Sequence, residues 1–322
     1  MSHIHAPVTL VADVGGTNTR LALATAGHVE QASIMRFANQ DATSLQSVIT
    51  RYLKDTNFPR PVAACVAIAG PVENGTGRLT NLNWQITDQD LHDITGTRHV
   101  SVINDLQAQA HALDDLPPGS CETLLGVKSG ITGTKLVIGI GTGCNAALAL
   151  TTNTGVTVSA SETGHIAMPV RSQSDLDLAL FLRQIYGFAS VENVLSGSGL
   201  ENLYRWHARH LPQSPPISAQ KIMAAMADRS DPAAVQAVQS VTQILAHVCA
   251  DLALIHLPFG GVYLVGGVAR ALAPYLSEFG FDTNFQDMGR FKAFMSRFSI
   301  SLVTYDYAAL IGCAKAIASV PR

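Results

Sequence analysis

Two short segments of this chain combine glycine and threonine in the pattern of a hairpin turn: Gly15-Gly16-Thr17, followed by Asn18, and Gly141-Thr142-Gly143. Glycine has no Cβ, so backbone N–H groups can converge on an anion in such a turn, and threonine hydroxyls add donors. A single turn of this kind is more often an ordinary tight hairpin. Two related turns in one chain favour a clamp for phosphate groups.

Asp13 lies just before the first of these turns. A carboxylate in this position suits Mg²⁺ bound through water, because Mg²⁺ keeps much of its hydration shell and needs only one or two carboxylates. The sequence therefore predicts that the first turn holds phosphate groups with Mg²⁺ nearby.

Asn104-Asp105 forms a second candidate for chemistry, at the junction of a predicted strand and a predicted helix. Asparagine and aspartate at such a junction are equally typical of an ordinary helix N-cap. A carboxylate at the carboxyl end of a strand can also accept a proton from an alcohol that attacks phosphorus. Asp105 is thus a candidate catalytic base.

Two common nucleotide motifs do not explain the glycines. Gly141-x-Gly143-x-x-Ala146, with Glu162 further on, matches the dinucleotide fingerprint, but that fingerprint needs a helix opening at the glycines. Residues 146–151 instead have the pattern of a strand. No Gly-Lys-Ser/Thr occurs, which excludes a Walker A loop.

The elements that position these residues form a repeated plan. A strand over 8–14, the first turn and a strand over 20–24 are matched by a strand over 136–140, the second turn and a strand over 146–151. Further elements are predicted as strands at 62–69, 99–103, 262–265 and 300–303, as helices at 45–53, 88–94, 106–113, 269–279 and 308–318, and as mainly helical stretches at 174–209 and 219–256.

Composition excludes several classes of protein. The chain has 322 residues, and 21 Lys plus Arg against 24 Asp plus Glu give a net charge of −3 with no basic run, which argues against nucleic acid as a partner. The most apolar stretch, 244–265, is interrupted by one aspartate, two histidines and a proline, which argues against a membrane span. No export signal is evident, so we expect a cytoplasmic protein.

Five cysteines are scattered, odd in number and without a CxxC pair. This pattern argues against a disulfide framework or structural zinc and predicts buried or half-buried thiols.

Seven blocks along the chain together resemble bacterial glucokinases of the hexokinase, sugar kinase and actin superfamily. The blocks are DVGGTNTRLALA at 13–24, AIAGPV at 67–72, INDLQA at 103–108, GIGTG at 139–143, ETGH at 162–165, ENVLSGSGLENLYR at 192–205 and GGVYLVGGVA at 260–269. They occur in order over essentially the whole chain.

The resemblance implies roles for individual residues. ATP phosphates would be held by the two turns, that is by Asp13, Gly15, Gly16, Thr17 and Asn18 and by Gly141, Thr142 and Gly143, with Gly266 and Gly267 beside the adenosine. Asp105 would be the catalytic base. The residues that bind glucose would be Asn104, Asp105, Glu162, His165 and Glu192. The implied reaction is transfer of a phosphoryl group from MgATP to the 6-hydroxyl of glucose.

The resemblance also implies a two-lobed α/β fold of the actin-like ATPase (ribonuclease H-like) type, with a duplicated core and an active site in the interlobe cleft. We predict that residues 1–106 and 304–322 form the small lobe and that residues 107–303 form the large lobe. Relatives are commonly dimers, so a homodimer is expected.

This chain departs from the family pattern at Cys144-Asn145, where further small residues often follow the second turn, and at Thr163, where glycine is frequent. It also lacks the Cys-rich zinc motif of the related ROK branch, so we predict no zinc. Alternatives left open are a kinase for another hexose, such as N-acetylglucosamine or mannose, polyphosphate as the donor, and a non-enzymatic sugar-sensing regulator. The regulator is disfavoured because only 12 residues precede Asp13, too few for a DNA-binding helix-turn-helix.

Overall fold

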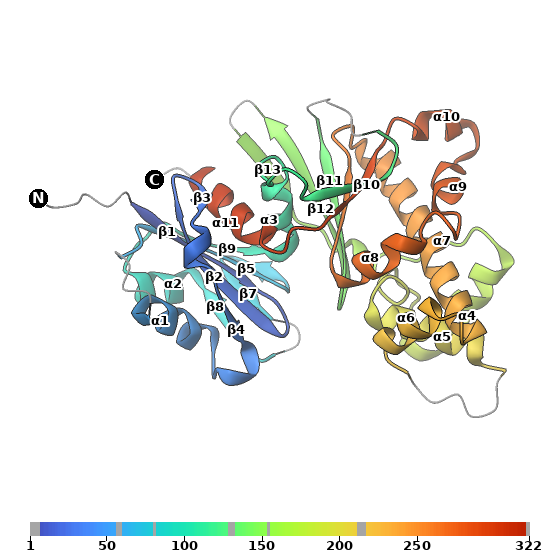
Figure 1. Cartoon of the computed structure of the whole chain (residues 1–322), viewed down its shortest axis with the longest axis horizontal. Helices are drawn as coiled ribbons and strands as arrows, with labels where there is room; N and C mark the ends of the chain where they lie inside the picture. Colours follow the sequence, from blue (N-terminus) through green and yellow to red (C-terminus); the bar gives the residue numbers. More distant parts are fainter. Residues whose placement is uncertain are drawn as a thin grey trace, which may run out of the picture. The chain divides into compact units, whose positions relative to one another are not determined.

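The computed structural model describes residues 7–55, 60–79, 82–127, 133–152, 155–210 and 217–319. Contacts group the chain into two compact units (Figure 1). Unit 1 comprises Met1–Pro118, Thr151–Ala160 and Tyr305–Arg322, and unit 2 comprises Gly119–Leu150 and Ser161–Thr304. Each unit has its own hydrophobic core.

The main sheet of unit 1 is built around the N-terminal hairpin. Its strands, in spatial order, are β3 (His28–Val29), β2 (Asn18–Thr25), β1 (Val8–Val14), β5 (Ala63–Ile68) and β9 (Val100–Asn104), with β4 (Met35–Ala38) also paired to β2. The pair β1–β2 is antiparallel, whereas β1, β5 and β9 run parallel. The predicted strand, turn and strand at the start of the chain are therefore confirmed.

Helices cover both faces of this sheet (Figure 1). They are α1 (Leu45–Asp55) and α2 (Asp88–Thr95) on one face, and α3 (Asp105–Ala112) and α11 (Ala308–Ser319) on the other. Each helix buries a stripe of apolar side chains against the sheet, and α3 packs along α11. The last helix, predicted to belong with the N-terminal part of the chain, packs on this sheet.

Side chains of β1 point alternately into two apolar clusters, one on each face of this sheet. Leu10 and Val14 pack in the cluster that contains α1 and α2, whereas Val11 packs in the cluster that contains α3 and α11. Successive side chains of a strand point to opposite faces, so Asp13 shares its face with Val11. The carboxylate of Asp13 therefore lies on the side of the sheet covered by α3 and α11.

The remaining elements of unit 1 are short. They are a small antiparallel sheet of β6 (Val72–Glu73), β7 (Thr76–Arg78) and β8 (Gln85–Thr87), and β13 (Gly155–Ser159), which contacts α3. Thr87 and Asp90 form a capping box that starts α2, and Gly96 in the left-handed region ends it.

The sheet of unit 2 repeats the plan of unit 1. Its strands, in spatial order, are β10 (Cys121–Leu125), β15 (Ile300–Val303), β14 (Val262–Val265), β11 (Lys135–Ile140) and β12 (Cys144–Thr152). The pair β11–β12 is antiparallel, and β11, β14 and β15 run parallel. The order β12-β11-β14-β15 therefore matches β2-β1-β5-β9, which confirms the predicted duplication. Because residues 144–152 form a strand, the dinucleotide fingerprint is excluded as predicted.

The helices of unit 2 are α4 (Gln173–Tyr186), α5 (Gly197–Ala208), α6 (Ala219–Ala227), α7 (Pro232–His256), α8 (Gly267–Leu272), α9 (Phe281–Gln286) and α10 (Lys292–Met295). Of these, α5, α6 and α9 pack against α7 in the main core. In length and hydropathy α7 could cross a membrane, and among the described residues no other helix passes that test. Within its most apolar window 67% is buried inside the protein, as in the core helix of a soluble protein.

Several predicted boundaries differ from the structure. The helical stretch 174–209 is interrupted between α4 and α5, and the stretch 219–256 breaks between α6 and α7, where Asp231 caps α7 with Pro232 in its first turn. The helix predicted at 269–279 begins at Gly267 and ends at Leu272, followed by a short 3₁₀ turn that contains Pro274. Contacts group the chain up to Pro118 in unit 1, in which α3 packs along α11.

Candidate active site

The first Gly/Thr turn joins β1 to β2 and is braced from outside the hairpin. The N–H of Gly15 donates to the carbonyl oxygen of Asn18 at 3.0 Å. The side-chain amide of Asn39 donates to the carbonyl oxygen of Gly15 at 2.8 Å, and its Oδ1 accepts from the Thr19 hydroxyl at 2.8 Å. Thr17, at the tip, is exposed. The turn is thus rigid at its base and accessible at its tip.

Asp13 forms an ion pair with Arg20 across the same hairpin. The two residues are opposite each other in the β1–β2 register, and Arg20 Nη1 lies 2.9 Å from Asp13 Oδ2. Burial raises the pKa of the Asp13 carboxyl, and the Arg20 guanidinium acts in the opposite direction. Sequence reasoning missed Arg20, although counting outward from the turn pairs position 13 with position 20.

Asn104 and Asp105 lie at the carboxyl edge of the same sheet. In the parallel register Asp13 is level with Ala67, and Ala67 is level with Ile103, so the residues that follow Ile103 come close to Asp13. Asn104 is also the N-cap of α3: its Oδ1 accepts from the N–H of Leu106 at 2.9 Å. The structural role expected of an N-cap is therefore present.

Asp105 is the first residue of α3, and its Oδ1 accepts from the N–H of Leu106 at 2.9 Å. Burial, together with the nearby negative charge of Asp13, raises the pKa of the Asp105 carboxyl to about 7. A carboxylate whose pKa lies near neutral pH is matched to taking up a proton under physiological conditions. The first unit thus brings together Asp13, Asn104 and Asp105.

The second Gly/Thr turn joins β11 to β12 in unit 2. The N–H of Gly141 donates to the carbonyl oxygen of Gly143 at 2.9 Å, and the carbonyl oxygen of Gly141 accepts from the N–H of Gly197 at 2.9 Å. Gly266 lies with φ +104° at the start of α8, so close to the carbonyl oxygen of Ile140 that a Cβ would collide with it. Unit 2 therefore brings the turn and the Gly266-Gly267 pair to the end of β11.

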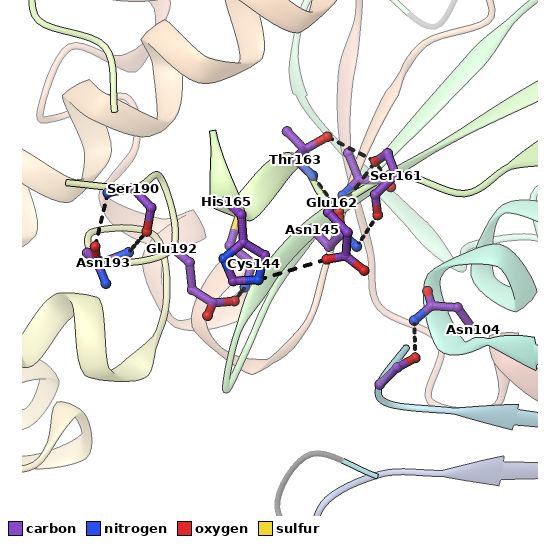
Figure 2. A network of polar contacts seen from close by, with 12 residues as sticks. Asn104, Cys144, Asn145, Ser161, Glu162, Thr163, His165, Ser190, Glu192 and Asn193 are labelled. Atoms are coloured by element: carbon purple, nitrogen blue, oxygen red, sulfur yellow. Dashed lines mark hydrogen bonds and ion pairs between the residues drawn. The ribbon is translucent and has the colours of Figure 1, made fainter. Parts of the chain in front are cut away.

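Glu162, His165 and Glu192 lie near the second turn (Figure 2). Glu162 and His165 are each 65% exposed, with His165 Nε2 at 3.9 Å from Glu162 Oε2. Glu192 Oε2 accepts from the N–H of Cys144, the residue that follows the turn, at 2.8 Å. The N–H of Glu192 donates to the carbonyl oxygen of Gly164 at 2.8 Å. Glu192 is thus hydrogen-bonded both to the residue that follows the second turn and to the segment that carries Glu162 and His165.

The cysteines carry no chemistry in this arrangement. Cys65, Cys144, Cys249 and Cys313 are buried and Cys121 is half-buried, as predicted. Burial, with a contribution from the Glu192 carboxylate, raises the pKa of the Cys144 thiol to about 12, so this thiol stays protonated and unreactive.

No group of three or more His, Cys, Asp or Glu side chains that could hold a metal occurs among the described residues. A metal bound mainly by water and phosphate does not need such a group.

Comparison with known proteins gives consistent results. A sequence profile of the glucokinase family matches residues 10–320. A glucokinase of Chromohalobacter salexigens is 33% identical over 314 residues, covering 96% of this chain and 97% of that protein.

Solved structures agree with this result. The crystal structure of a glucokinase from an Antarctic psychrotroph superposes with a TM-score of 0.86 at 29% identity, covering 98% of this chain and all of that one. A glucokinase from Balamuthia mandrillaris in complex with glucose superposes with a TM-score of 0.82 at 21% identity, covering 99% and 96% of the two chains, a likeness in fold alone. The predicted α/β fold of the actin-like ATPase type is confirmed.

Proposed function

Because this chain belongs to the glucokinase family, we propose that it transfers the γ-phosphoryl group of ATP to the 6-hydroxyl of glucose. The protein is an ATP-dependent hexose kinase by family. The observation that carries the residue assignment is the Asp105 carboxyl, whose pKa is raised to about 7 by burial and by its neighbour Asp13. Such a group is suited to act as a general base at neutral pH.

In the proposed step, Asp105 accepts the proton of the glucose 6-hydroxyl as its oxygen attacks the γ-phosphorus. The bond between that oxygen and phosphorus forms, and the bond from the γ-phosphorus to the bridging oxygen of ADP breaks. In phosphoryl transfer the protein contributes mainly positioning and electrostatic stabilisation. Positioning alone can supply ~7 to 11 kcal/mol of the barrier reduction.

We assign sugar binding to Asn104, Asp105, Glu162, His165 and Glu192. A pyranose offers hydroxyls that both donate and accept hydrogen bonds, so carboxylates can accept from them while histidine and the amide NH₂ donate. A site built this way discriminates by ~10⁴ or more against a sugar that leaves its polar groups unpaired. The exposure of Glu162 and His165 supports this role, because these side chains are accessible to a ligand.

We assign the ATP phosphates to the two turns: Asp13, Gly15, Gly16, Thr17 and Asn18 in unit 1, and Gly141, Thr142 and Gly143 in unit 2. The adenosine is assigned to the neighbourhood of Gly266 and Gly267. Braced turns with exposed tips support this assignment.

Mg²⁺ fits the residues of unit 1. Asp13 is a half-buried carboxylate with a raised pKa near a second half-buried carboxylate, Asp105, and it is paired with Arg20. An additional cation would compensate this charge, and a single carboxylate acting through water is sufficient for Mg²⁺. When bound, Mg²⁺ supplies neutralisation of charge on the phosphates.

The test is an ADP-release assay with glucose, mannose, fructose and N-acetylglucosamine as acceptors, each with ATP and with polyphosphate. We expect ATP and glucose to give the highest kcat/KM. A higher kcat/KM with another hexose would identify that hexose as the substrate, and a higher value with polyphosphate would identify polyphosphate as the donor. No turnover with any pair would contradict the proposed function.

We further propose that the protein is cytoplasmic and forms a homodimer. The proposal of a dimer comes from the resemblance to bacterial glucokinases, which are commonly dimers. Light scattering after size-exclusion chromatography tests the dimer, since a monomer mass at micromolar concentration would contradict it. Cell fractionation tests the compartment.

A further inference from the structure

Asn145, the second residue of β12, binds the backbone on both sides of Glu162 (Figure 2). Its Oδ1 accepts from the N–H of Thr163 at 2.9 Å, and its Nδ2 donates to the carbonyl oxygen of Ser161 at 2.5 Å. Ser161 and Thr163 are the two chain neighbours of Glu162. One side-chain amide therefore holds both peptide groups that flank this carboxylate.

The segment 161–165 keeps its conformation mainly through hydrogen bonds, which include the bond from the Glu192 N–H to the Gly164 carbonyl oxygen at 2.8 Å. It contains only a short 3₁₀ turn, Thr163–His165, and the side chains of Glu162 and His165 are exposed. The Ser161 hydroxyl adds a bond to the carbonyl oxygen of Ala146 at 2.7 Å. Hydrogen bonds to the start of β12, instead of apolar packing of its functional side chains, hold this segment.

The same network includes the positions where this chain departs from the family pattern. Gly164 packs so closely on the carbonyl oxygen of Cys144 that a Cβ there would collide with it. The N–H of Cys144 donates to Glu192, and Asn145 binds the N–H of Thr163. Cys144, Asn145 and Thr163 thus belong to one set of contacts, which the sequence did not reveal.

The side-chain oxygen of Asn145, Oδ1, accepts hydrogen bonds from within the protein. Oδ1 accepts from the N–H groups of Thr163 and Ala146 at 2.9 and 2.8 Å and, at 3.3 Å, from the Ser161 hydroxyl. This oxygen is therefore engaged by the backbone and acts on a ligand only through the residues that it holds.

We propose that Asn145 is a positioning residue for hexose binding, which fixes segment 161–165 so that Glu162 and His165 can contact the sugar. The inference rests on the proposed function, because it takes these two residues as sugar ligands. A displacement of about 1 Å in a binding group can cost up to ~10²-fold in activity. Losing the amide is therefore expected to weaken glucose binding about tenfold, an intermediate value on that scale.

The experiment compares Asn145→Ala with the matched variant Asn284→Ala. Asn284 lies in α9, and its amide likewise joins two groups: Oδ1 pairs with His247 Nε2 at 3.1 Å, and Nδ2 donates to the carbonyl oxygen of Gly280 at 2.8 Å. Glucose Kd is measured by calorimetry, ATP KM by ADP release, and stability by thermal melting. A residue with a purely structural role would lower the melting temperature without changing glucose Kd.

We expect Asn145→Ala to raise glucose Kd about tenfold, with a smaller change in ATP KM. Asn284→Ala should leave both constants unchanged. Equal glucose Kd in Asn145→Ala and wild type, or a larger effect on ATP KM than on glucose Kd, overturns the inference.

Asn145→Asp provides a second variant in case Asn145→Ala does not fold. It keeps acceptor contacts of Oδ1 but sets a carboxylate oxygen, which cannot donate, against the Ser161 carbonyl oxygen, so its glucose Kd should also rise above that of wild type. A glucose Kd equal to that of wild type contradicts the role of this donor. Failure of the wild type to phosphorylate glucose would instead contradict the proposed function. This outcome is therefore distinguishable from failure of the inference about Asn145.

Discussion

The two Gly/Thr turns occupy equivalent places in the two sheets, yet their surroundings differ. The first turn follows Asp13, which is paired with Arg20 and lies near Asp105. The second turn is followed by Cys144, whose N–H binds Glu192, and by Asn145, which binds segment 161–165. The same hairpin therefore has different polar surroundings in the two units: an aspartate paired with an arginine in unit 1, and hydrogen bonds to Glu192 and to segment 161–165 in unit 2.

The difference is visible in how each turn is braced. In unit 1 the brace is Asn39, whose amide binds the carbonyl oxygen of Gly15 in the turn. In unit 2 the bond from Gly197 holds the turn, while the amide of Asn145 is directed to another segment. The duplicated fold has thus kept its backbone and specialised its polar contacts.

The largest expected effect is on kcat, and it compares Asp105 in unit 1 with Glu192 in unit 2. Asp105→Asn keeps an oxygen that can accept from the N–H of Leu106 but removes the base, so kcat should fall at least ~10²-fold. Glucose Kd should stay near that of wild type, as calorimetry would detect. As a comparison in unit 2, Glu192→Gln should raise glucose Kd. Near-normal turnover of Asp105→Asn would show that unit 1 does not supply the base.

A second variant tests whether the first turn handles the nucleotide. Asp13→Asn removes the charge proposed to bind Mg²⁺ and should lower kcat/KM for ATP about 10- to 100-fold, the range for losing a charged interaction of ~1.5 to 3 kcal/mol. Kinetics over a Mg²⁺ series would measure this, with an increased Mg²⁺ requirement expected. Unchanged ATP kinetics at every Mg²⁺ concentration would rule out the metal role of Asp13.

A third variant compares the two braces. Asn39 is 3% exposed, and Asn39→Ala leaves the Gly15 carbonyl and the buried Thr19 hydroxyl without their partner, so the free energy of unfolding should fall by about 1 to 3 kcal/mol. ATP KM should rise while glucose Kd does not, opposite to Asn145→Ala. Denaturant unfolding would measure the stability, and steady-state kinetics and calorimetry would measure ATP KM and glucose Kd. Equal changes in ATP KM and glucose Kd would contradict the proposed difference between the turns.

The smallest expected effect concerns pH and stability. Asp105 titrates near 7 when folded and near its ordinary value of 3.8 when unfolded, so between these values the folded protein retains a proton that the unfolded chain has lost. Stability contributed by this carboxyl is therefore lost as pH rises towards 7.

Asp105→Asn abolishes that dependence. Its melting temperature relative to wild type, measured in EDTA, should increase by a few degrees between pH 5 and pH 8. If the difference in melting temperature between variant and wild type stays constant across this pH range, Asp105 ionises in the folded protein as it does in water.

Local patterns predicted the parts of the fold that depend on local physics. The alternation in residues 8–14 and the glycines at 15 and 16 define the first hairpin, and Asn104 marks the start of α3 as its N-cap. Strand β10 was missed because its residues, Cys121–Leu125, are partly exposed and do not alternate in polarity.

The site was predictable only where its residues are adjacent in the chain or carry a family motif. Arg20 could have been found from hairpin register, since it lies two residues after Asn18 and Asp13 lies two residues before Gly15. Asn39 and Asn145 could not, because their partners are set by tertiary packing of separate segments. An asparagine that holds a backbone segment has no sequence pattern of its own.

The place of α11 in unit 1 has a consequence for synthesis on the ribosome. One face of the first sheet, including Val11 and Cys65, is covered by side chains of α11 such as Leu310 and Ile317. The N-terminal strands therefore emerge early but keep an uncovered apolar face until translation reaches α11. Unit 2 can close its own core before that point, and the first part of the chain to be made becomes the last to reach its native state.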